Sequence, residues 1–434
     1  MPCPEFACAT IKDFDSLRDR LKKRDNPDSV MDERVRDIIA EVAARGDEAL
    51  VEFTRAFDCP DFSAAMIPVP AAEIAAARAK VPQKDMEIIA EAAANIREFH
   101  QAQLERSWWT TRPDGTILGQ MVRPVDSAGL YVPGGQGGET PLISSLLMNA
   151  IPAQVAGVAR LAAVSPPRRD GSLNPYILAA ADLLGITEIY RLGSAWAIAA
   201  LAFGSASIPA VDVIVGPGNI FVATAKRLLS GKVGIDMIAG PSEILVVADD
   251  TADPECLAAD LLSQAEHDPQ AAAVLITDSA DLARRAAKAL KTRTAALPRS
   301  EIAEKALTEY GAIVTVDNLD MAMELSNLMA PEHLELAVRD PWSLLPLVRH
   351  AGAVFLGHMS PEPVGDYFAG PNHVLPTMGT ARFSSALSVE VFCKKSSVIA
   401  ASKAYVQAHG AKIARLARLE GLEAHARSVE SRLG

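Results

Sequence analysis

The chain has 434 residues, of which 49% are hydrophobic and 22% charged, which favours two or three globular domains with large buried cores. Its net charge of −12 comes without a basic block, which argues against a nucleic-acid partner or an anionic membrane surface. The stretch closest to a membrane span, residues 142–158, is interrupted by Asn149, Pro152 and Gln154, so no span is expected.

The N-terminal segment and the cysteines favour a cytoplasmic protein. The first 24 residues lack the apolar core of a signal peptide. The five cysteines form neither a CxxC pair nor a regular framework, which is typical of reduced thiols.

Residues 12–107 are expected to be mostly helical. Apolar residues recur at three- and four-residue spacing through residues 32–58, and Gly46 marks a break between two helices. These residues therefore predict a mainly helical N-terminal region, for which we take residues 1–120.

From about residue 120, short β-branched runs alternate with helical segments. The first series predicts strands at 161–167, 188–193 and 211–216, separated by helices at 175–185, 195–204 and 219–229. The second series predicts strands at 243–250, 271–279, 312–318, 333–338 and 353–358, with a helix at 254–267 after the first of them. Strands that alternate with helices of ten or more residues indicate parallel βαβ units, and all-apolar strands indicate sheets covered on both faces.

The predicted fold is therefore α/β, with two doubly wound parallel-sheet modules at residues 121–238 and 239–380. No strand is expected after about residue 380, and residues 397–433 are expected to form a helical tail within a last region, 381–434. Such a tail has little sheet of its own to pack on, so we expect it to cross to a second subunit.

The helix predicted at 254–267 ends in polar residues. On a helical wheel, Gln264 and His267 continue the buried stripe that Leu257 and Leu261 begin. Buried polar groups need partners, and two residues three positions apart on one helix face can hold one metal ion. The alternative is a satisfied core histidine beside a capping glutamine.

Three further segments carry candidate polar groups. Glu332 and His333, just before a strand, could act as two proton-transfer groups, or could lie in a surface loop. The segment 364–377, read as a loop rich in glycine and proline, carries Asp366, Asn372 and His373, which could instead form Asx turns. Glu420 and His425 on the tail could simply form a polar helix face.

Two glycine-containing turns could hold an anion such as a phosphate. Residues 216–227 follow a predicted strand and open a helix, but lack the GxGxxG spacing of a dinucleotide site. Residues 131–141 form an equally ambiguous glycine-rich turn. Taken alone, the residues indicate a two-module α/β enzyme that could carry a metal, and they do not reveal the reaction.

Six segments taken together carry a specific resemblance. They are VGPGNIFVATAKR, IDMIAGPSE, SQAEHD, APEHLEL, VGDYFAGPNHVLPT and EGLEAHARSVE. Together they resemble the histidinol dehydrogenase family over nearly the whole chain. The resemblance implies two NAD-linked oxidations of L-histidinol, through L-histidinal, to L-histidine at the end of histidine biosynthesis. It also implies one zinc ion per subunit and a homodimer with two Rossmann-like domains.

The resemblance also implies roles for single residues of this chain. The implied zinc ligands are Gln264, His267, Asp366 and His425, with His425 reaching the zinc of the partner subunit. His333 would be the general base, and Glu332 would activate water to hydrate the aldehyde. The implied substrate contacts are the four zinc ligands, His333, Ser242, His373 and Glu420.

The implied NAD contacts are Tyr131, Asn219 and the position of Trp196, where the family usually has glutamine. Because an indole donates a single hydrogen bond, this departure removes one polar cofactor contact or replaces it by stacking. The zinc and proton-transfer positions all match.

Three other functions compete with this expectation. A relative could oxidise another primary alcohol with the same residues, but the match at Ser242, His373 and Glu420 argues against that. A zinc hydrolase could use Glu332 and His333 to activate water without forming NADH. A non-catalytic assembly protein would have little reason to gather these polar groups near an apolar core.

Overall fold

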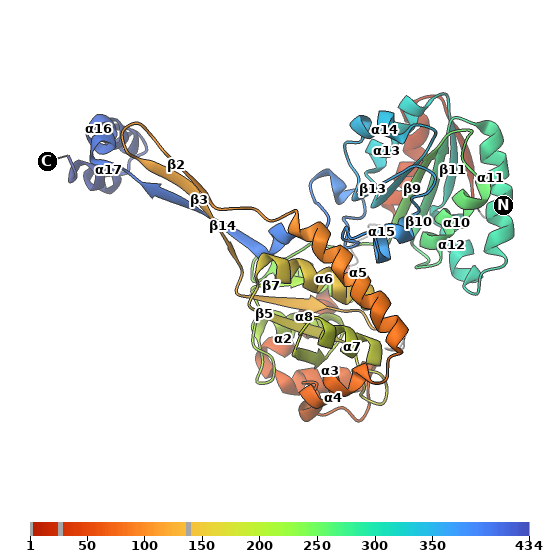
Figure 1. The fold of residues 1–434 in the computed structure, drawn as a ribbon, viewed down its shortest axis with the longest axis horizontal. Helices are drawn as coiled ribbons and strands as arrows, with labels where there is room; N and C mark the ends of the chain where they lie inside the picture. Colours follow the sequence, from red (N-terminus) through yellow and green to blue (C-terminus); the bar gives the residue numbers. More distant parts are fainter. Residues whose placement is uncertain (1–2, 25–28, 136–139, 434) are drawn as a thin grey trace.

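The computed structural model describes residues 3–24, 29–135 and 140–433. Two parallel sheets, each covered by helices on both faces, are joined to an antiparallel arm that ends in the C-terminal helices (Figure 1). The predicted α/β fold with two doubly wound modules is confirmed. No helix in the described ranges has both the length and the apolar character needed to cross a membrane.

The first sheet has the strand order β6-β5-β4-β7-β8, and all its pairs are parallel. Its strands are β4 (Ser127–Tyr131), β5 (Arg160–Ser165), β6 (Glu188–Arg191), β7 (Val213–Val215) and β8 (Gly234–Ile235). The connecting helices are α6 (Ile143–Ala156), α7 (Pro175–Leu183), α8 (Ser194–Phe203) and α9 (Ile220–Leu229). Alternate side chains of β4 and β5 enter two separate apolar clusters, so this sheet is buried on both faces.

The N-terminal helices complete the cover of the first sheet. They are α2 (Ser29–Arg45), α3 (Asp47–Phe57), α4 (Ala71–Arg78) and α5 (Gln83–Gln101). The 3₁₀ turn η2 (Ala64–Met66) lies between α3 and α4. Side chains of α4 and α5 join the cluster of α6 and α7, whereas α2 and α3 join that of α8 and α9. The helical reading of most of this region is confirmed, but its helices share the core of the first sheet.

The second sheet has the order β1-β11-β10-β9-β12-β13, again all parallel. Its strands are β1 (Glu5–Cys8), β9 (Glu243–Ala248), β10 (Ala272–Thr277), β11 (Ala312–Val316), β12 (His333–Ala337) and β13 (Ala353–Leu356). One face is covered by α10 (Pro254–Ala265), α11 (Ala280–Thr294) and α12 (Ser300–Tyr310). The other face is covered by α1 (Asp15–Lys22), which follows η1 (Ile11–Phe14), and by α13 (Leu319–Met329).

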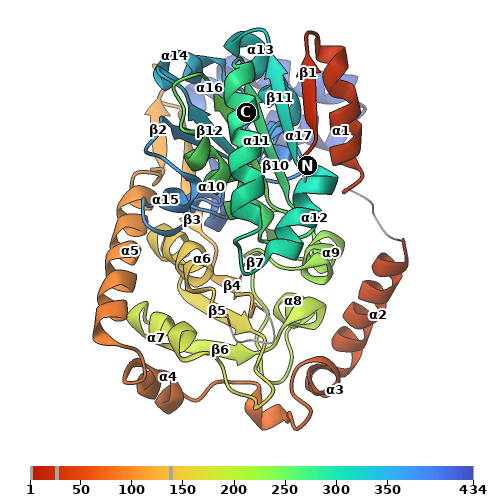
Figure 2. The same ribbon diagram turned by 90° about the vertical axis from the view of Figure 1, so that its right-hand side faces the viewer.

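Strand β1 was not predicted. Residues 5–8 lie beside β11 at the edge of the second sheet, so the beginning of the chain belongs to the module built mainly from residues 243–380 (Figure 2). Shorter elements surround this sheet: α14 (Pro341–Leu344), η4 (Leu345–Leu347), α15 (Glu362–Tyr367), η5 (Thr380–Arg382) and η6 (Val389–Phe392).

The expectation that strands end near residue 380 is wrong. Strand β14 (Cys393–Ala400) pairs antiparallel with β3 (Ile117–Pro124) over eight residue pairs, and β3 also pairs with β2 (Trp108–Thr111). Most side chains of β14 are exposed, so its sequence lacks the alternation of apolar and polar residues that would predict a strand. The helices α16 (Lys403–Leu419) and α17 (Glu423–Glu430) follow at the far end of this arm (Figure 1).

Candidate functional site

Polar side chains gather at the amino ends of two central strands of the second sheet. Glu243 is the first residue of β9 and His333 the first residue of β12, and the two strands are neighbours, with His333 opposite Ile244. Helix α10 runs antiparallel to the strands, so its carboxyl end reaches the same edge. Ligands of doubly wound sheets usually bind at the carboxyl ends of the strands. This cluster lies instead at the amino ends, on the other edge of the sheet.

Glu332 and His333 are both buried, which rules out the surface-loop alternative. Helix α13 ends at Ala330 in a left-handed conformation with φ of 51°, which turns the chain toward β12. The main chain of Glu243 then holds both side chains. Its N–H donates to Glu332 Oε2 at 2.8 Å, and its carbonyl oxygen lies 2.9 Å from His333 Nδ1.

The bond to Glu243 fixes the orientation of the imidazole. A carbonyl oxygen can only accept, so His333 Nδ1 is the nitrogen that donates. His333 Nε2 is therefore left facing the site, where it is buried and has no hydrogen-bond partner among the described residues. It lies 3.6 Å from Asp366 Oδ1. A buried, unpaired nitrogen of this kind suits contact with a bound ligand.

Asp366 comes from the short helix α15, which also carries Glu362 one turn earlier. The expected loop at 364–377 is therefore helical at its start. His373 Nδ1 donates to the main-chain oxygen of Asp366 at 3.1 Å, which holds the half-buried His373 near the cluster. Asn372 has a structural role instead. Its Nδ2 donates to the carbonyl of Met148 and its Oδ1 accepts from the N–H of Val374, as in the predicted Asx-turn alternative.

The carboxyl end of α10 packs against α15, the helix that carries Asp366, so residues of both helices can belong to one site. Gln264 is buried and close to the last residue of the helix, Ala265. His267 lies beyond the helix end, contrary to the prediction of a helix through residue 267, and it is exposed at the rim. Ser263 Oγ donates to Glu362 Oε2 at 2.8 Å and so ties α10 to α15.

Burial and close charges shift the protonation of these groups. Burial raises the pKa of Glu332 to about 8. Burial alone would lower the pKa of His333, but Glu332 and Asp366 outweigh it and raise that pKa to about 10. The protein atoms packed around the exposed His267 partly desolvate its ring and lower its pKa, against the opposing effect of Asp366. For Asp366, contacts with His333 and Glu362 overcome the effect of burial and lower the pKa of its carboxyl. Shifts of this kind are common at catalytic sites.

Sequence reasoning missed a second row of acids behind Asp366. Glu335 Oε1 accepts from the N–H of Glu362 at 2.7 Å. Burial raises the pKa of Glu335 to about 8, of Glu362 to about 7 and of Asp260 to about 6. Two of these acids could have been predicted from their spacing. Glu335 lies two residues after His333 on the same strand face, and Glu362 lies one helical turn before Asp366.

The cluster offers donors suited to a metal ion. Ligand atoms of His333, Glu362 and Asp366 lie within 4.8 Å of one another, and Asp366 also belongs to the predicted zinc set. The unpaired His333 Nε2 belongs to this N/O donor set, whose chemistry fits zinc. The electrostatic effect of Asp366 on His267 indicates that the imidazole at the rim is nearby. Glu362 is already bonded to Ser263, so it suits a supporting role better than that of a ligand.

Glu420 and His425 are not brought to Asp366 within one chain. Both are exposed and line one hollow on the tail, together with Leu416 and Val429. Helix α17 lies at the far end of the arm, at the opposite end of the molecule from β9 and α15 (Figure 1). Ser242, in contrast, directly precedes β9 and is half-buried at the cluster.

The predicted cofactor contacts all lie on the first sheet. Asn219 is exposed at the start of α9, where its Oδ1 accepts from the N–H groups of Phe221 and Val222. Tyr131 is buried, and its hydroxyl accepts from the N–H of Ser194 at 3.1 Å. The indole of Trp196 is buried in the apolar core, so its position is explained by packing without a contact to the cofactor.

Two phenyl rings flank that indole. The ring of Phe53 stacks on it with a centroid distance of 5.8 Å, and that of Phe57 with 5.6 Å. Nearby, Gly216 of the predicted anion-binding turn donates its N–H to Asp236. Of the glycine-rich turn at 131–141, residues 136–139 lie outside the described residues.

Comparison with known proteins adds a family to this geometry. The sequence model described as histidinol dehydrogenase matches residues 21–433. The chain is 62% identical over 433 residues to the histidinol dehydrogenase of Oleidesulfovibrio alaskensis, covering all of both chains. It is 60% identical over 432 residues to that of Nitratidesulfovibrio vulgaris, covering 100% of this chain and 99% of the relative. The crystal structure of histidinol dehydrogenase from Elizabethkingia anophelis has a TM-score of 0.93 at 36% identity, covering 100% of this chain and 98% of that one.

Proposed function

Because the chain belongs to the histidinol dehydrogenase family, we propose that it oxidises L-histidinol through L-histidinal to L-histidine, with two molecules of NAD. The contact of His333 with both Glu332 and Asp366, at a site with an unpaired buried nitrogen, supports this most strongly. The net charge of −12 without a basic block is consistent with a small-molecule substrate.

His333 is the general base of both oxidations. Because Nδ1 donates to the carbonyl of Glu243 and the pKa of His333 is raised to about 10, the ring also carries a proton on Nε2 near neutral pH. Release of that proton leaves a lone pair on Nε2, which faces Asp366, and the ring can then act as a base. Nε2 accepts the hydroxyl proton of the alcohol as hydride leaves the same carbon for NAD. In the second oxidation it accepts a proton from the hydrate of the aldehyde in the same way.

Glu332 activates the water that hydrates the aldehyde. Its carboxyl is buried beside His333, with Oε2 and His333 Nδ1 3.7 Å apart, and burial raises its pKa toward neutrality. A carboxyl with a pKa near the working pH can both take a proton from water and return it.

Zinc would be held by Gln264, His267 and Asp366 of one chain and by His425 of the partner. Zinc has no redox chemistry, and when bound it would hold the imidazole and amino nitrogens of the substrate. Ser242, His373 and the partner's Glu420 would complete the substrate contacts. Exposed Asn219 would contact NAD, whereas Tyr131 and Trp196 are buried and would support the wall of the cofactor site.

The position of the tail supports a homodimer with shared sites. Helix α17, which carries His425, lies far from α15, which carries Asp366 (Figure 1), and His425 shares a hollow with Glu420. Exposed Leu416 lines that hollow, and Leu419 and Leu422, close to it in the sequence, are exposed as well. An exposed apolar surface beside polar site residues suits insertion into a second subunit.

The reaction is tested by counting NADH formed for each L-histidinol consumed. Two NADH per histidinol are expected, whereas other amino alcohols should be poor substrates. A hydrolase or an assembly protein would form no NADH, and rapid oxidation of unrelated amino alcohols would point to another alcohol as the substrate.

The shared site is tested by mixing two inactive variants, His267→Ala and His425→Ala, and letting their subunits exchange. In a mixed dimer, one site carries both lesions and the other carries neither, so activity should reappear. If His425 served its own chain, every site would carry one lesion, and no mixture could recover. Absence of rescue, with exchange shown by differently tagged subunits, would refute the shared site.

A further inference from the structure

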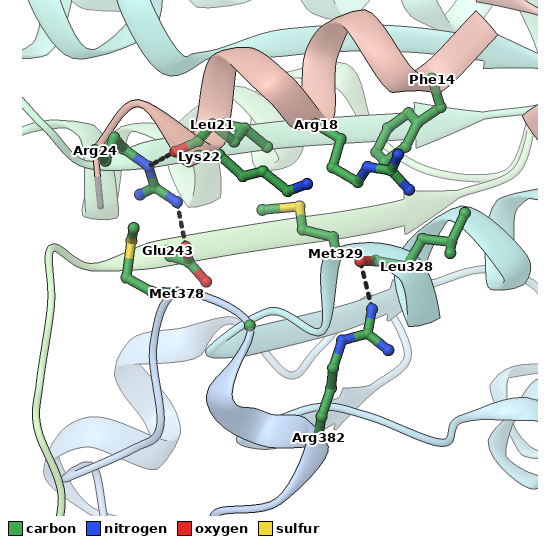
Figure 3. Close-up of a pocket in the computed structure, with 11 residues that line it drawn as sticks. Phe14, Arg18, Leu21, Lys22, Arg24, Glu243, Leu328, Met329, Met378 and Arg382 are labelled. Atoms are coloured by element: carbon green, nitrogen blue, oxygen red, sulfur yellow. Dashed lines mark hydrogen bonds and ion pairs between the residues drawn. The ribbon is translucent and has the colours of Figure 1, made fainter. Parts of the chain in front are cut away.

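A cavity lined in part by Glu243 lies between α1, the end of α13 and the turn at η5 (Figure 3). Its volume is about 390 Å³, within the range of small-molecule pockets. Part of its wall is apolar, with Phe14, Leu21 and Met329 among the lining residues. None of the residues assigned to the reaction lines it.

The charged side chains of this cavity are mostly cations. Arg18, Lys22, Arg24 and Arg382 line it, with Glu243 as the single acid. Arg24 and Glu243 form a buried ion pair and neutralise each other. The remaining three side chains make a cationic pocket in a protein whose net charge is −12.

Two of these three cations, Lys22 and Arg382, are weakly compensated by nearby carboxylates. Arg382 Nη2 donates to the carbonyls of Asn327 and Leu328, and no carboxylate of the described residues pairs with it. Lys22 lies 3.8 Å from Asp19, but both side chains are about two-thirds exposed, so water screens that pair.

Arg18 pairs with the half-exposed Asp15 at 2.6 Å. Its Nε, however, is buried and has no hydrogen-bond partner among the described residues. A buried guanidinium nitrogen without an acceptor has a hydrogen bond left to give to a bound anion.

We propose that this cationic pocket binds a phosphate monoester. Arginine presents a planar fork that matches phosphate oxygens, and lysine adds a point charge. Two arginines and one lysine from α1 and η5 can surround one phosphate group. The pocket is much larger than a phosphate ion, and its apolar wall suits the organic part of an ester.

The test is calorimetric titration of the full-length protein with glycerol 3-phosphate at constant ionic strength, with inorganic phosphate and glycerol as comparison ligands. Saturable binding of one ester per chain is expected, tighter than that of inorganic phosphate and without binding of glycerol. The double variant Lys22→Gln, Arg382→Gln should lose affinity by about tenfold or more, because it loses two charge-assisted contacts. The matched control is Lys23→Gln, an exposed lysine at the same helix end that does not line the pocket.

Circular dichroism of each variant checks its fold, and Lys22→Gln alone, at an exposed side chain, replaces the double variant if that one unfolds. The proposal is overturned if the wild type shows no saturable binding at millimolar concentrations. It is equally overturned if the variants bind as tightly as the wild type, or if Lys23→Gln weakens binding as much as they do. An ester that binds no more tightly than inorganic phosphate would refute the role of the apolar wall.

Discussion

The two parallel sheets have the same layered plan, but they use their buried polar side chains differently. On the first sheet, these groups bind main-chain atoms and each other. Lys226 pairs with Asp236 and donates to the carbonyl of Gly216, and Asn149 Nδ2 donates to the carbonyl of Tyr131. On the second sheet, Glu332 and His333 have strongly shifted pKa values and leave a ring nitrogen unpaired. Single unpaired buried atoms also occur in the first module, such as Asn149 Oδ1 and Trp196 Nε1. The comparison therefore teaches that neither a shared fold nor one unpaired atom locates the chemistry, whereas a cluster of buried groups with shifted pKa values does.

If the second sheet carries the chemistry, the largest loss of activity should follow substitution of His267 at the rim of its site. His267→Ala should lose both zinc and activity while remaining folded, because its side chain is exposed and contributes little to the core. Metal analysis and the NADH assay measure the two losses. His358→Ala, an exposed histidine just beyond the carboxyl end of β13, is the matched control. Full zinc together with full activity in His267→Ala would sink the metal assignment.

A somewhat smaller effect should come from the general base. His333→Ala should slow both oxidations by about 10²- to 10⁴-fold, the usual contribution of such a group. Single-turnover assays started from the alcohol and from the aldehyde measure each step. If His358→Ala slowed turnover as much, the chemistry would belong to the carboxyl edge of the sheet instead of the amino edge.

Within the second sheet, Glu332 should affect only one of the two steps. Glu332→Gln can still accept from the N–H of Glu243, so the strand end should keep its geometry. A carboxamide cannot act as a base, so oxidation of the aldehyde should slow by about 10²-fold while alcohol oxidation changes little. Equal slowing of both steps would contradict this division of roles.

The smallest effect on chemistry should come from the first sheet. Trp196→Gln should lower the free energy of unfolding by about 3 kcal/mol or more, because a buried, stacked indole is replaced by a smaller polar group. Trp196→Phe keeps much of the packing and should leave the Michaelis constant for NAD nearly unchanged. Denaturant unfolding and steady-state kinetics measure both. A raised constant for NAD in the Phe variant, with that for histidinol unchanged, would instead locate the indole at the cofactor.

The sequence predicted the parts of the fold that have a strong apolar pattern. The runs at 243–250 and 333–338 are buried on both faces, and they were recognised as parallel strands. Strand β14 was missed because its side chains are largely exposed and its stability comes from pairing with residues far away in the chain. Strand β1 was missed because four residues at a sheet edge carry too little pattern.

The candidate site was only partly predictable for a similar reason. Glu332, His333, Gln264 and Asp366 stood out as polar residues within apolar segments. Glu362 did not, because the six-residue helix α15 lies in a stretch rich in glycine and proline that was expected to be a loop. The fixed orientation of His333 depends on a main-chain carbonyl 90 residues away, which no local pattern encodes.

The strand pairing of β1 with β11 also determines the order in which the molecule can fold. The first sheet and its helices come from residues 29–235, so most of this module can assemble as soon as that stretch is synthesised, before Val374, Leu387 and Phe392 join its core. The second sheet must hold residues 5–8 against residues 313–316, and the arm must wait for residues 393–400. Contacts of such long sequence separation form slowly, since a large loop has to close first. We therefore expect that a nascent chain matures from its middle outward, and that the second sheet and the C-terminal arm are completed last.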